Sequence, residues 1–125
     1  MPAKKTFHVE VDAARNLART QFFGNVTAEQ MKSGVAEVER HLLGLRAGFA
    51  VLADLSGLET MELECAPHLS KIMDLCRAHG VGLVVRVIPD PSKDIGLNIL
   101  SLIHYRGKVR IVTCETLAEA ERALK

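Results

Sequence analysis

The chain has 125 residues, of which 48% are hydrophobic, so it can build one substantial core but is short for two domains. Its 16 Lys and Arg residues nearly balance 15 Asp and Glu residues, so there is no basic excess with which to bind nucleic acid. We therefore expect a single domain over residues 1–125, with an ordered core over 7–124, and no nucleic-acid partner.

The cysteine pattern argues against a metal site and against a disulfide framework. Cys65, Cys76 and Cys114 are an odd number and include no C-x-x-C pair. No apolar signal core follows the N-terminal lysines, and the longest uncharged apolar run, residues 95–105, is about half of the roughly 20 residues that a membrane-spanning helix needs. We expect a cytoplasmic protein with no transmembrane segment and no cofactor.

The chain begins with two segments that have the composition of β-strands. Phe7, Val9 and Val11 alternate with polar residues, which is typical of a strand with one face in water. Residues 17–23 are rich in strand-forming residues and end at the turn pair Gly24-Asn25. The two segments are predicted to form a hairpin.

A helix should follow, and then a buried strand. Thr27-Ala-Glu-Gln30 matches a capping box, in which Thr and Gln side chains satisfy backbone N–H groups at a helix start. Residues 49–53 and 81–88 are continuous apolar runs, as expected of strands buried on both faces. The apolar residues of the helix recur every three or four positions: Met31, Val35, Val38, Leu42 and Leu45.

Between the two apolar runs the sequence predicts a turn and a second helix. Asp54-Leu-Ser-Gly57 has the composition of a turn that closes the first buried strand. Pro67 is tolerated only in the first turn of a helix, so the helix should begin between Leu63 and Ala66. Gly80 should end it.

The rest of the chain predicts a third helix, a short strand and a fourth helix. Ser92 can cap the third helix, residues 109–112 form the strand, and Thr116-Leu-Ala-Glu119 is a second capping box. The order of elements predicts an α/β sandwich with a mixed sheet of about five strands and four helices.

Three parts of this pattern resemble the STAS domain family, which includes the SpoIIAA-like anti-sigma factor antagonists of bacteria. Gly24-Asn-Val-Thr27 is similar to the end of the family's second strand and the helix cap after it. Asp54-Leu-Ser-Gly57 resembles its D-L-S-G turn. Val109-Arg-Ile-Val112 and Thr116-Leu-Ala-Glu-Ala120 are similar to its closing strand and last helix.

The resemblance implies a non-catalytic regulatory module that binds a protein. In the family, a D-S-[ST]-G segment follows D-L-S-G, and a partner that is both kinase and anti-sigma factor phosphorylates its second hydroxyl residue. Here that segment falls on residues 62–65, and Glu64 occupies the phosphorylated position. The implied partner is an anti-sigma factor or a kinase-like ATPase.

The glutamates at this junction have three interpretations, one of which is that the surface serves some other partner or ligand. Carboxylates near a helix N-terminus stabilise the helix and need no other role. Alternatively, Glu64 is a permanent imitation of phosphoserine, with a smaller charge and fewer acceptor oxygens. If Glu64 imitates phosphoserine, the partner-binding surface consists of Thr27, Ser56, Gly57, Glu62 and Glu64.

The third predicted helix supports a different hypothesis. Ile95, Ile99 and Ile103 belong to a helix that is apolar on more than one face. They could simply pack in the core, form a homodimer contact, or line a pocket for a small hydrophobic ligand. In the last case the chain would be a carrier or sensor of a lipid-like molecule.

Overall fold

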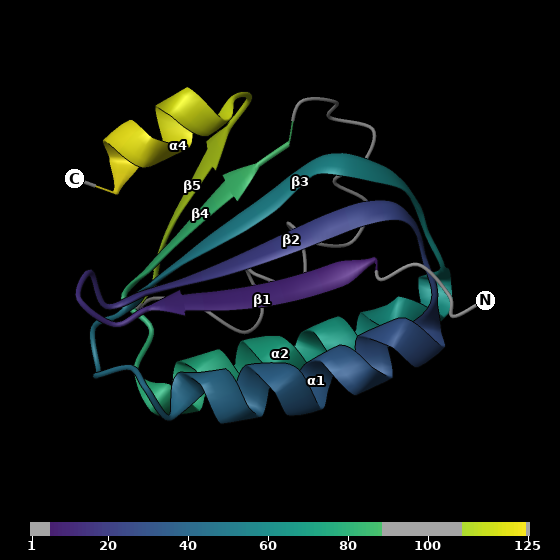
Figure 1. The fold of residues 1–125 in the computed structure, drawn as a ribbon, viewed down its shortest axis with the longest axis horizontal. Helices are drawn as coiled ribbons and strands as arrows, with labels where there is room; N and C mark the ends of the chain where they lie inside the picture. The colour runs from purple at the N-terminus through teal and green to yellow at the C-terminus, as the bar shows by residue number, and fades with distance from the viewer. Residues whose placement is uncertain (1–5, 89–108, 125) are drawn as a thin grey trace.

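The computed structural model of the protein describes residues 6–88 and 109–124. These residues form a five-stranded mixed sheet in which the strands lie in chain order, β1-β2-β3-β4-β5. Helices α1 and α2 cover one face of the sheet, and α4 lies on the other (Figure 1). The predicted α/β class and the mixed sheet are confirmed.

The predicted hairpin at the start of the chain is confirmed. β1 (Phe7–Asp12) and β2 (Leu17–Val26) are antiparallel, with Phe7 opposite Phe22 and Asp12 opposite Leu17. The prediction that β2 ends at Gly24-Asn25 is wrong, because the strand continues to Val26.

β3 (Ala50–Met61) is the longest strand, and it continues through the predicted turn. The prediction that Asp54-Leu-Ser-Gly57 closes the strand is therefore wrong. Leu55 and Ser56 together lie opposite one residue of β2, so this segment forms a β-bulge. The Asp54 carboxylate accepts a hydrogen bond from the Ser56 N–H at 2.9 Å, which satisfies a donor that the bulge takes out of the ladder.

A second bulge follows in the same strand pair. Leu58 and Thr60 pair with the consecutive residues Gly24 and Asn25, which leaves Glu59 as the extra residue of β3. Bulges bend a strand and increase its twist. The far ends of β2 and β3 curve together toward the starts of α1 and α2 (Figure 1).

α1 (Ala28–Leu42) connects β2 to its parallel neighbour β3. The predicted capping box is present: the Thr27 hydroxyl accepts from the Gln30 N–H, and the Gln30 side chain accepts from the Thr27 N–H, both at 3.3 Å. Met31, Val38 and Leu42 are buried as the spacing predicts. Val35 is only half-buried, and Leu45 is buried but lies beyond the end of the helix.

α2 (Ala66–His79) leads from β3 to β4 (Leu83–Val87), which pairs parallel to β3. A short 3-10 turn, η1 (Leu63–Cys65), precedes it, so the predicted start between Leu63 and Ala66 is confirmed. Gly80 ends the helix in the left-handed conformation at φ 94°, which glycine adopts without a steric penalty.

The last two elements lie at the other edge of the sheet. β5 (Arg110–Cys114) pairs parallel to β4, and Thr116 caps α4 (Leu117–Ala123) by accepting the Glu119 N–H at 3.2 Å. The described ranges contain three α-helices. The helix predicted after Ser92 lies outside them, as do Ile95, Ile99 and Ile103.

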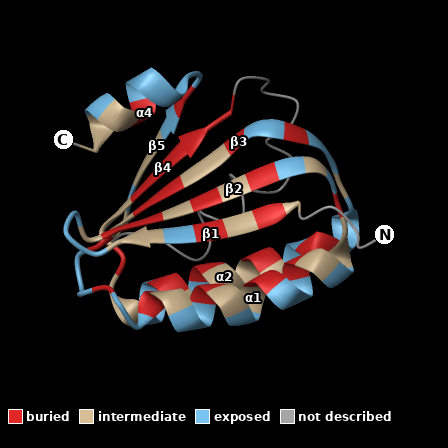
Figure 2. Ribbon diagram, in the orientation of Figure 1, coloured by how far each residue is buried: buried red, intermediate tan, exposed pale blue. Residues whose placement is uncertain are grey.

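The sheet separates two groups of buried side chains. Figure 2 colours the buried residues red along the strands and helices. The larger group packs between the sheet and α1 and α2, with Phe49 and Met31 fully buried. The smaller group lies under α4, where Ala120 is fully buried against Val85 and its neighbours. Side chains of β3 and β4 point into both groups, which explains why these strands read as apolar runs.

Candidate functional site

The candidate site is the end of the molecule where β2 and β3 stop and α1 and η1 begin. The Glu62 N–H donates to the Val26 carbonyl oxygen at 3.1 Å. The last residue of β2 is therefore still hydrogen-bonded to the first residue after β3. The Cys65 thiol donates to the same carbonyl at 3.7 Å. These contacts fix the start of α2 beside the start of α1.

Thr27 and Glu62 meet at the N-terminus of α1. The Glu62 carboxylate accepts a hydrogen bond from the N–H of Ala28, the first residue of that helix, at 2.8 Å. The Thr27 hydroxyl is already engaged in the capping box, where it accepts the Gln30 N–H. Glu62 therefore places negative charge at the positive end of α1, although it lies next to α2 in the sequence.

Glu64 lies in η1, the turn that immediately precedes α2, and its side chain is exposed. Leu63 beside it is 79% exposed, which is unusual for a large apolar side chain. η1 thus presents a carboxylate and an apolar group to solvent.

Ser56 and Gly57 lie apart from the other predicted site residues. Four residues of strand lie between Gly57 and Glu62, so the five steps that join them span up to roughly 16 Å at about 3.3 Å per residue. Gly57 pairs with Phe23, and a Cβ on Gly57 would approach the Phe23 ring to 2.8 Å. The structure therefore brings Thr27, Glu62 and Glu64 to one end of the curved strand pair and leaves Ser56 and Gly57 farther along it.

Two further exposed residues lie along the β2–β3 pair near Gly57 and are not evident in the sequence pattern. Phe23 is 42% exposed on β2, and Glu59 is exposed on β3. A Cβ on Gly24 would lie 3.8 Å from a carboxylate oxygen of Glu59, so Glu59 reaches across the strand pair. The sequence offers one signal for Phe23. In a strand, consecutive side chains point to opposite faces, so only one ring of the pair Phe22-Phe23 can point into the same core.

Cys65 is not prepared to act as a nucleophile. Its side chain is fully buried, and burial raises the pKa of the thiol above its usual range. The charges of Glu62 and Glu64 raise it further. A reactive cysteine needs the opposite environment, exposed and close to positive charge.

Other kinds of site find no support in the part of the chain that the structure describes. Residues 6–88 and 109–124 contain no group of three or more His, Cys, Asp or Glu side chains arranged to hold a metal ion. No helix in those ranges combines the length and apolar character needed to cross a membrane.

The fold is similar to those of several solved structures. The anti-sigma factor antagonist SpoIIAA in its unphosphorylated form aligns with a TM-score of 0.64 and 11% identity, over 94% of each chain. An uncharacterised DUF3478-family protein with a SpoIIAA-like fold from Shewanella loihica PV-4 gives 0.69 and 15%, over 95% of this chain and 92% of that one. An anti-sigma factor antagonist from Mycobacterium paratuberculosis gives 0.59 and 17%, over 99% and 98%.

These similarities show that the chain has a SpoIIAA-like fold. Comparison with protein-family models and with curated protein sequences gives no match. Because one fold serves many functions, the function has to be argued from the surface.

Proposed function

We propose that this SpoIIAA-like protein is a non-catalytic regulatory module that binds a protein partner through the start of α2. Its fold is that of anti-sigma factor antagonists, and it exposes Glu64 and Leu63 in the turn before that helix. The exposed pair is the observation that carries the proposal.

The composition of the surface suits protein recognition. Interfaces are centred on apolar side chains that become buried and are surrounded by polar groups. Leu63 is an exposed apolar group, while Glu62 and Glu64 supply negative charge. The complementary partner has a basic surface with an apolar recess, and a kinase-like anti-sigma factor is the partner that the fold suggests.

Glu64 gives this module a fixed state in place of a switch. A phosphorylated serine carries up to two negative charges, whereas a carboxylate carries one that no kinase or phosphatase can change. We infer that binding of the partner does not depend on phosphorylation at this position.

The test compares variants of Glu64 against the partner recovered with the wild-type protein from its native extract and then purified. Calorimetry should show that Glu64→Ala weakens binding about tenfold, the effect of one charge-assisted hydrogen bond. With a kinase-like partner and ATP, Glu64→Ser should gain phosphate that the wild type does not.

Leu63→Ala should also weaken binding, and Leu43→Ala is its control. Leu43 is 82% exposed at the opposite end of α1, so it tests whether any exposed leucine has the same effect. Equal affinities for the wild type, Glu64→Ser and Glu64→Ala would remove Glu64 from the interface.

A further inference from the structure

The last helix, α4, covers the smaller apolar group of the sheet while burying little of itself. Of its seven residues Ala120 alone is buried, and Leu117 is 45% exposed. Isolated helices shorter than about 12 residues are marginal in water. The helix therefore depends on its packing against β4 and β5, over which it lies (Figure 1), and on its bonds to other parts of the chain.

Two ion pairs tie α4 to the start of the chain. One carboxylate oxygen of Glu121 lies 2.6 Å from a terminal nitrogen of Arg19 in β2. The other oxygen lies 3.2 Å from a terminal nitrogen of Arg15, in the turn between β1 and β2. All three side chains remain partly exposed. Such an ion pair changes an equilibrium by up to about fivefold and is screened by salt.

The apolar residues beneath α4 include a cysteine that can report on the helix. Cys114, the last residue of β5, is 5% exposed and belongs to the same buried group as Ala120 and Val85. Cys65 and Cys76 are buried in the larger group, on the face that α1 and α2 cover. A movement of α4 alone would uncover Cys114 and leave the other two thiols buried.

We propose that α4 is a salt-sensitive lid, which lifts from the sheet while the sheet stays folded. The strands are joined by continuous backbone ladders, whereas α4 is held by Ala120, by the partly buried Ala123 and Leu124, and by the two ion pairs of Glu121. Local opening takes place in the least stable parts of a fold. Salt favours the open lid because it weakens both ion pairs.

Opening of the lid exposes the apolar side chains of Leu52 and Val85 together with the thiol of Cys114. The inference is independent of the proposed protein partner, because α4 lies on the opposite face of the sheet from α2 (Figure 1) and uses neither Leu63 nor Glu64. It also leaves the larger core, between the sheet and α1 and α2, intact.

Thiol labelling of the full-length protein tests the proposal. N-ethylmaleimide is uncharged, and mass spectrometry of the digested protein shows which cysteine it has modified. At neutral pH, Cys114 should react at least about tenfold faster than Cys65 and Cys76, which require the larger core to open. Raising the NaCl concentration from about 0.01 M to about 1 M should speed the reaction of Cys114 by about fivefold.

Variants separate the ion pairs from other effects of charge. Glu121→Gln should react about fivefold faster than the wild type at low salt and should lose the dependence on salt. Arg19→Gln should speed the reaction in the same direction from the other side of the pair. Glu115→Gln removes the same charge from an exposed residue next to Cys114, so it is the matched control and should stay within about twofold of the wild type.

Two results on the wild type would overturn the proposal. Labelling of Cys114 that does not depend on salt would show that the ion pairs do not hold α4. Equal rates for the three cysteines would show that the thiols react only when the whole molecule unfolds. Equal rates at Cys114 for Glu121→Gln and Glu115→Gln would likewise contradict a role for the two ion pairs.

Discussion

Gly34 of α1 is a glycine because Phe7 of β1 occupies the space that a side chain would need. A Cβ on Gly34 would lie 2.5 Å from an atom of the Phe7 ring, and Phe7 is only 3% exposed. The close approach of α1 to the edge of the sheet depends on this pair.

We predict that Gly34→Ala destabilises the protein. Alanine gains about 1 kcal/mol in helix propensity, but overpacking a core typically costs about 1–3 kcal/mol. Urea denaturation should therefore give a net loss of about 1 kcal/mol or more. The neighbouring change Ser33→Ala, on the exposed side of α1, should be neutral or slightly stabilising. A Gly34→Ala protein more stable than the wild type would show that Phe7 moves aside freely.

The buried thiol of Cys65 predicts a dependence of stability on alkaline pH. Burial, together with Glu62 and Glu64, raises its pKa above that of an unfolded cysteine, so the folded state holds the proton more tightly. This contribution is fully present below about pH 9, where an unfolded thiol ionises, and it is lost as pH rises toward the folded-state pKa.

Free energies of unfolding measured between about pH 8 and pH 10 should fall more steeply for the wild type than for Cys65→Ala. The difference in slope can reach about 1.4 kcal/mol per pH unit for one group. Parallel pH profiles for the two proteins would contradict the prediction, whatever the absolute cost of removing the sulfur.

Thr27 and Glu62 connect α1 with the end of β2 and with the segment that leads from β3 into α2. Thr27 caps α1, and the Glu62 carboxylate binds the first N–H of the same helix from the chain that leads into α2. Two orphan donors of α1 therefore depend on residues far apart in the sequence.

Thr27→Ala should lower the free energy of unfolding by about 1–2 kcal/mol, because it removes the acceptor for the Gln30 N–H. Thr27→Ser keeps that acceptor and should remain within about 0.5 kcal/mol of the wild type. Urea denaturation of the three proteins checks both values. Equal losses for the two variants would mean that the methyl group of Thr27, and not its hydroxyl, stabilises this end of α1.

Local patterns predicted the helix boundaries well, because capping boxes, Pro67 and Gly80 act on their immediate neighbours. They failed at Asp54-Leu-Ser-Gly57, where the same residue types that form turns also form bulges. The outcome there depends on whether a partner strand continues alongside, and β2 does continue to Val26. The hydrogen bond from the Ala28 N–H of α1 to the Glu62 carboxylate could not be predicted for a similar reason, because it depends on where β2 ends.

The order of strands places β3 at the centre of the described sheet, with a neighbour on each side. β1 and β5 are the edge strands of the described sheet and each pairs with one neighbour. The central strands also carry buried side chains on both faces.

We predict that amide hydrogen exchange is slowest for residues 51–53 of β3 and distinctly faster for the outward-facing amides of β1. Exchange at the centre of a sheet requires global unfolding, whereas edge amides exchange through local opening. Mass spectrometry or NMR at neutral pH can compare the two strands. Equal protection of β1 would indicate that another chain or segment pairs with its outer edge.

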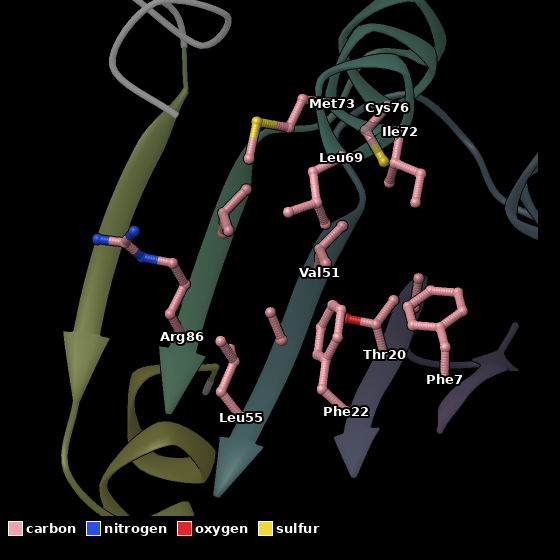
Figure 3. A pocket seen from close by; sticks show the side chains of 13 residues that line it. Phe7, Thr20, Phe22, Val51, Leu55, Leu69, Ile72, Met73, Cys76 and Arg86 are labelled. Carbon is pink, nitrogen blue, oxygen red and sulfur yellow. The ribbon is translucent and has the colours of Figure 1, made fainter. Parts of the chain in front are cut away.

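The fold class could be predicted from the sequence, but the apolar cavity of about 70 Å³ between α2 and the sheet (Figure 3) could not. Ala18, Thr20 and Ala53 are unremarkable in a strand, and their alignment is set by the register between strands that α1 separates in the chain. Arg86 likewise appears as an interruption of an apolar run until β4 is paired with its neighbours.

Because the strands are arranged in the order of synthesis, the sheet can be assembled from one side as the polypeptide leaves the ribosome. Each new strand finds the preceding strand already available as a template, and no early strand has to wait for the carboxyl end of the chain. Nascent chains that end after residue 88 should thus already be able to form the first four strands, with the face that α4 later covers still open to chaperones.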